Sequence, residues 1–121
     1  MQSQQATSGL GTPYLTNGAA LQHYVANAVV PPSVDWIKAT GGAGGIMLTL
    51  TPGSTPTGDP TNPRWLYETY YAMKEDAAAG AITFVDPNGA FFNGQSSYEL
   101  TNQYQWAIFQ WDGIGWHVIG N

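Results

Sequence analysis

The chain has 121 residues, of which eight are acidic and three are basic, so its formal net charge is −5 at pH 7. This length fits one domain, and the lack of cysteine excludes disulfides and thiolate metal sites. Lys38, Arg64 and Lys74 are too few cations to neutralise many phosphates, which argues against nucleic-acid binding. No apolar run approaches the roughly 18 residues of a membrane-spanning helix, so we expect no membrane partner.

Few residues of the chain carry a charge. The charged fraction is 9%, against about 25% in an ordinary soluble domain, while 13% of the residues are aromatic. Disordered chains are depleted in aromatic residues, so the composition predicts a folded chain. With so few ionic groups to keep copies apart, its surface is expected to be covered in part by other protein.

The first 33 residues are predicted to form an N-terminal arm, because no charged side chain precedes Asp35. The stretch to about Ser8 is rich in Gln, Ser and Thr without periodicity, which is typical of an extended tail. Four apolar residues then follow the i, i+3, i+4, i+7 spacing of an amphipathic helix, namely Leu21, Tyr24, Val25 and Ala28. A short helix over 19–28 and an extended arm therefore both remain open.

An arm without ionic groups packs either on its own domain or on another subunit. The second alternative makes the arm a contact element, and its apolar residues are then the predicted partner contacts. These residues are Tyr14, Leu15, Leu21, Tyr24, Val25, Val29 and Val30.

Residues 34–121 are predicted to form a β domain. Short runs rich in Val, Ile, Thr, Phe, Tyr and Trp alternate there with clusters of Gly, Pro, Asn and Asp. The strand at 46–51 places Ile46, Leu48 and Leu50 on one side. Residues 52–63 are rich in proline, which lacks a donor, so we expect a surface loop and a second partner contact. The contact residues are Pro52, Pro56, Pro60, Pro63 and Trp65.

Residues 65–79 carry conflicting signals, because the tyrosines favour a strand and the stretch 75–79 favours a helix. Further strands are expected at 81–86, 97–101 and 104–111, and a hairpin turn at 112–115 leads into 116–119. The strand at 104–111 is apolar on both faces, which predicts burial on both sides, or burial on one side and an interface on the other. The residues expected to define this part of the fold are Trp106, Trp111, Asp112, Gly113 and Trp116.

The order of these motifs resembles a β module of structural proteins in tailed bacteriophages, over residues 46–119. The motifs that carry the resemblance are Ile46-Met47-Leu48-Thr49-Leu50, Tyr71-Ala72-Met73-Lys74-Glu75-Asp76, Gly80-Ala81-Ile82-Thr83-Phe84, Asn93-Gly94-Gln95-Ser96-Ser97-Tyr98-Glu99-Leu100, and Trp111-Asp112-Gly113 with Trp116. Such modules occur in tail-fibre, baseplate and capsid-decorating proteins. The resemblance implies a strand over 67–74 and a hairpin loop over 75–80.

Residues for catalysis or for binding a metal or cofactor are sparse, and we predict no catalytic residue, no metal site and no cofactor. His117 has no second histidine at metal-ligand spacing and no thiol to activate. Glu75 and Asp76 are adjacent, whereas a catalytic acid and base must oppose each other across a substrate. The sequence Asp86-Pro87-Asn88-Gly89 lacks the remaining oxygen ligands of a calcium loop and favours a turn.

These observations predict an all-β fold, a small antiparallel β-sandwich or flattened barrel with an extended N-terminal arm. The expected function is that of a non-enzymatic capsid decoration protein on the exterior of a phage virion. Its expected partners are the major capsid protein and itself, as a homodimer or homotrimer. The alternative is a host-recognition module of a tail fibre or baseplate that binds surface carbohydrate through exposed tryptophans.

Overall fold

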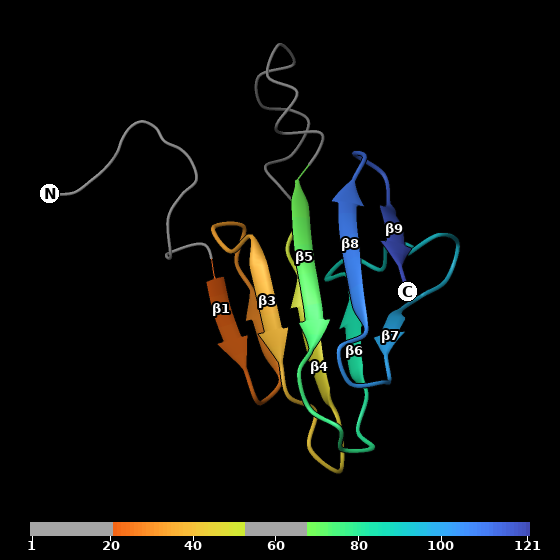
Figure 1. Ribbon diagram of the computed structural model, residues 1–121. Helices are drawn as coiled ribbons and strands as arrows, with labels where there is room; N and C mark the ends of the chain where they lie inside the picture. The colour runs from red at the N-terminus through yellow and green to blue at the C-terminus, as the bar shows by residue number, and fades with distance from the viewer. Residues whose placement is uncertain (1–20, 53–67) are drawn as a thin grey trace, which may run out of the picture.

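The computed structural model describes residues 21–52 and 68–121, and these ranges form nine strands and no helix. Two mixed sheets pack against each other without closing into a barrel (Figure 1). Sheet A has the order β1-β3-β5-β8-β9 and sheet B the order β2-β4-β6-β7. The strands are β1 (Leu21–Tyr24), β2 (Ala28–Val30), β3 (Trp36–Ala39), β4 (Ile46–Leu50), β5 (Thr69–Lys74), β6 (Ile82–Val85), β7 (Tyr98–Leu100), β8 (Trp106–Trp111) and β9 (Trp116–Gly120). The predicted all-β sandwich is confirmed, and the barrel alternative is not.

Much of the strand pairing is parallel, which the sequence analysis did not anticipate. From β1 to β6 the chain crosses to the other sheet after every strand, so it returns to each sheet in the same direction. The pairs β1-β3, β3-β5, β2-β4 and β4-β6 are therefore parallel. The expected antiparallel pairing holds for β5-β8, β6-β7 and β8-β9. Residues 75–80 accordingly connect the two sheets and are not the hairpin loop that we expected.

The described part of the predicted arm belongs to the sandwich. Strand β1 pairs with β3 at the edge of sheet A, and β2 pairs with β4 at the edge of sheet B. The predicted helix over 19–28 is therefore wrong for the residues from Leu21 onward. Strand pairing outweighs the helical spacing here, and Val29 and Val30 of β2 are β-branched residues that favour strands. Within the described residues, 21–24 and 28–30 are thus strands of the two sheets.

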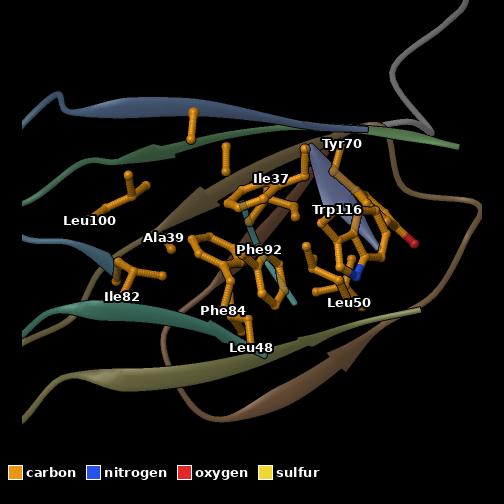
Figure 2. Packing of buried hydrophobic residues seen from close by; sticks show 14 of the residues in the cluster. Ile37, Ala39, Leu48, Leu50, Tyr70, Ile82, Phe84, Phe92, Leu100 and Trp116 are labelled. Atoms are coloured by element: carbon orange, nitrogen blue, oxygen red, sulfur yellow. The ribbon is translucent and has the colours of Figure 1, made fainter. Parts of the chain in front are cut away.

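Aromatic side chains fill the space between the two sheets. Phe109 of sheet A lies 4.6 Å from Phe84 of sheet B, measured between ring centroids, and 5.8 Å from Phe92. Figure 2 shows Phe84, Phe92 and Trp116 gathered between the sheets. The indole Nε1 of Trp116 donates a hydrogen bond to Asp86 Oδ1 over 3.0 Å. Asp86 is buried, so this bond attaches the turn at 86–90 to the core.

A buried lysine holds one end of the sandwich together. Lys74 is fully buried, and its Nζ donates to Oδ1 of Asp76 (2.6 Å), to the carbonyl of Asp76 (2.7 Å) and to that of Ala78 (2.9 Å). The Asp76 carboxylate also accepts the backbone N–H groups of Gly41 and Gly42. We call Lys74, Asp76 and these two glycines the Lys74 cluster. It ties the loop after β5 to the loop after β3.

The Lys74 cluster predicts a loss of stability in acid. The hydrogen bond from Lys74, followed by those from Gly41 and Gly42, lowers the pKa of Asp76 from 3.8 to about 2. A carboxyl whose pKa is lower in the folded state stabilises the fold above the unfolded pKa, and this contribution is lost as the pH falls through the folded value. Urea unfolding midpoints should therefore fall between pH 3.8 and about 2, and the Asp76→Asn variant should show a smaller fall. Equal falls for both proteins would contradict the prediction.

Candidate functional site

A row of apolar side chains crosses all five strands of sheet A on its outer face. Inward residues such as Ile37, Tyr70 and Phe109 are buried in the core, so their neighbours along each strand point outward. The strand register aligns one of these outward residues from each strand with the next. The five residues, which we call the apolar row, are Leu21, Trp36, Tyr71, Ile108 and Ile119. Figure 1 shows the five strands side by side in one layer.

The apolar row is open to solvent along its length. Trp36 is 46% exposed and Ile119 is 66% exposed, and Leu21, Tyr71 and Ile108 are partly exposed. The rings of Trp36 and Tyr71 stack at a centroid distance of 4.9 Å and an interplanar angle of 18°. This stack fixes two large aromatic surfaces in one orientation, which lowers the entropy cost of binding against them.

A shallow hollow of about 320 Å³ lies beside the stack, over strands β5 and β8. Among the described residues, no charged side chain lines it. The lining residues are Trp36, Tyr71, Ala72, Met73, Trp106, Ala107 and Ile108. The hollow is therefore suited to an apolar or aromatic group.

Polar groups border the apolar row on both sides. On one side Glu75 lies 3.4 Å from His23 Nδ1 and 3.7 Å from Lys38 Nζ. On the other side His117 Nε2 lies 2.6 Å from Asp112 Oδ2. An apolar centre with a polar rim is the usual arrangement of a protein–protein interface.

The pair of His117 and Asp112 is also the closest approach to catalytic geometry in the described ranges. Asp112 Oδ1 accepts the backbone N–H groups of Ile114 and Gly115, and these bonds, with the His117 contact, lower the pKa of Asp112. The carboxylate is thus committed to the turn between β8 and β9, and the histidine side chain is 66% exposed. This arrangement orients an exposed imidazole at the surface of sheet A.

Residues 21–52 and 68–121 contain no group of three or more His, Cys, Asp or Glu that is arranged to hold a metal ion. In the same part of the chain, no helix has the length and apolar character needed to cross a membrane.

The predicted arm contacts divide between surface and core. Leu21 lies on the apolar row, and Val25 and Val29 are exposed. Tyr24 packs partly against the core. Val30 is fully buried inside the sandwich, so its prediction as a partner contact is wrong. Tyr14 and Leu15 lie outside the described residues.

The predicted loop contacts are mostly beyond what the structure describes. Pro52 is half-buried and lies two residues after the end of β4. The remaining four positions lie outside the described ranges, namely Pro56, Pro60, Pro63 and Trp65.

The predicted fold-defining residues lie in two places. Trp111 and Trp116 are buried in the core, and their rings lie 5.1 Å apart. Asp112 and Gly113 form the turn between β8 and β9, where Gly113 has a φ of 97° that suits glycine. Trp106 instead faces outward and lines the hollow.

Sequence reasoning missed Trp36, Tyr71 and Ile119 as site residues. One local signal is present in the sequence, because β5 repeats the two-sided apolar pattern of β8. Tyr70 and Ala72 are buried, while Tyr71 and Met73 point the other way. The alignment of these residues into one row depends on strand register, which has no local signature.

Comparison with known proteins gives no guide to function, because no family model matches the chain and no curated protein matches its sequence.

Proposed function

We propose that the protein is a non-enzymatic structural component of a tailed-phage virion. In this proposal it is a decoration protein on the capsid exterior, and it binds and stabilises the lattice of the major capsid protein. The observation that carries the proposal is the apolar row, which spans the whole width of sheet A and has a polar rim.

Covering the apolar row is favourable. Full burial of a large apolar side chain contributes about 1.5–3 kcal/mol, so covering the exposed parts of five such residues contributes roughly 1 kcal/mol each. Binding that occurs in the folded state and not in the unfolded state stabilises the fold by mass action. The same linkage stabilises the lattice to which the protein binds.

The resemblance to phage structural modules supports the choice of a virion. Its motifs fall on regular elements of the sandwich: 46–50 is β4, 82–84 lies in β6 and 98–100 is β7. Asn93 and Gly94 have φ values of 50° and 86°, as a tight hairpin turn requires, and Phe92 bridges to Gln95 across them.

Binding to isolated, undecorated capsids tests the proposal. The full chain should bind, and Trp36→Lys should weaken binding at least about tenfold, because the ammonium would lose hydration in the contact. Met47→Lys is the matched control, since Met47 is also 46% exposed but lies on sheet B. A copy number per purified virion near that of the capsid subunits would support the proposal. A copy number as small as that of a tail component would refute it.

A second candidate is host recognition through surface carbohydrate, which the half-exposed Trp36–Tyr71 stack favours. Sugars stack on such rings and need hydrogen-bonding groups beside them, which Lys38 and Glu75 supply. A glycan array with the full chain distinguishes the two functions. Under this candidate Glu75→Gln should weaken glycan binding, whereas the capsid-decoration proposal predicts no glycan binding at all.

A further inference from the structure

We infer that the apolar row of sheet A is covered by the apolar row of a second copy of this chain, related by a twofold axis near Tyr71. The inference rests on the proposed function in one respect, because it takes the row to be a protein-contact surface. It adds the identity of the partner that covers this surface when no capsid is present.

Charge favours sheet A over sheet B for contact between copies. Each copy carries a net charge of −5, so contact is most favourable where neither copy presents an unpaired acid. The apolar row has no charged member, and Glu75, which borders it, is paired with Lys38 and His23. The outer face of sheet B carries the exposed Glu99 beside Thr83, so stacking two such faces brings like charges together.

The shape of the row is complementary to itself. Its order is Leu21, Trp36, Tyr71, Ile108 and Ile119, with Tyr71 at the centre. A twofold axis that passes over Tyr71 parallel to the strands places Trp36 opposite Ile108 of the second copy, and Leu21 opposite Ile119. The aromatic stack of each copy then faces the hollow over β5 and β8 of the other. Contacts of this kind are isologous and close into a dimer.

The size of the face predicts a weak dimer. Five strands spaced by about 4.8 Å, each with about five residues of 3.3 Å, cover roughly 400 Å² per copy. Two copies therefore bury roughly 800 Å², below the about 1,200–2,000 Å² of stable complexes. We expect a reversible dimer with a dissociation constant in the micromolar range or weaker, which leaves the row available to a capsid lattice.

Sedimentation equilibrium of the full chain without capsids tests the inference. The average mass should rise from monomer to dimer with concentration. Trp36→Lys and Ile119→Lys should each raise the dissociation constant at least about tenfold. Met47→Lys is the matched control on sheet B, with the same exposed fraction of 46% as Trp36, and should leave the dissociation constant unchanged. Far-ultraviolet circular dichroism checks that each variant is folded.

A cross-linking experiment tests the position of the axis. The natural chain has no cysteine, so a single introduced thiol is unique. Tyr71→Cys should give covalent dimers with a short bismaleimide, and Met47→Cys should not. Equal cross-linking of both variants would overturn the inference, and so would a mass that stays monomeric at every concentration. A trimer would overturn the twofold arrangement.

The outcomes separate the inference from the proposed function. A monomer that still binds capsids through Trp36 refutes the dimer and leaves the capsid role intact. A dimer that does not bind capsids supports the inference and refutes the capsid role. A row that is covered by sugar alone predicts glycan binding by a monomer, which refutes both.

Discussion

Replacing Lys74 with Met is expected to lower the free energy of unfolding by about 3 kcal/mol. The Lys74 ammonium is fully buried and donates hydrogen bonds to three oxygens, of Asp76 and Ala78. Methionine fills a similar volume but supplies no donor, so the Asp76 carboxylate loses its charged partner. Removing one member of a buried ion pair typically costs about 3–5 kcal/mol, and the low end applies because Asp76 is partly exposed. Urea denaturation at neutral pH measures the change.

Lys38→Met is the control for this prediction. Lys38 is also a strand lysine with a carboxylate partner, but it is 38% exposed and lies 3.7 Å from Glu75. Exposed pairs contribute about 0–1 kcal/mol, so this variant should stay close to the natural protein. Low protein concentration keeps self-association out of both measurements. Similar losses of unfolding free energy in the two variants would mean that the burial of Lys74 does not strengthen its ion pair with Asp76.

The strands of the sandwich could be predicted from sequence where their signals are local. Alternation at Ile46, Leu48 and Leu50 correctly predicted the buried face of β4. The turn at 112–115 correctly predicted the hairpin of β8 and β9, since Asp and Gly adopt the conformations that it requires. Each of these predictions depends on residues within one strand or one turn.

The strand order could not be predicted in the same way. Two strands separated by a crossover to the other sheet have no turn to set their direction, so the parallel pairing of β3 and β5 left no local signal. The apolar row depends on the same pairing, since Trp36 and Tyr71 meet only through that register. The helical spacing from Leu21 to Ala28 was misleading, because β1 and β2 gain pairing partners that a short isolated helix lacks.

The loop connections depend on close backbone packing, and Gly80→Ala is expected to lower the free energy of unfolding by about 3 kcal/mol or more. A Cβ at Gly80 would lie 2.1 Å from the amide nitrogen of Gly45 and 2.4 Å from the carbonyl oxygen of Gly42. These atoms are backbone, so relief requires the two loops to separate. The Gly80 N–H also donates to the Gly42 carbonyl over 2.8 Å, and separation would weaken this bond. Thermal and urea unfolding should both show the loss.

Gly44→Ala is the matched control, because it lies in the same glycine-rich loop with open space where its Cβ would be. The φ of Gly44 is not in the left-handed region, so alanine fits there without strain. We expect a neutral or slightly stabilising effect, because alanine lowers the conformational entropy of the unfolded chain. A large loss at Gly80 with none at Gly44 would locate the constraint at the meeting of the two loops. The Lys74 cluster joins the same loops, so Gly80→Ala combined with Lys74→Met should cost less than the sum of the single changes. Additive costs would show that the close glycine contact and the buried lysine stabilise the fold independently.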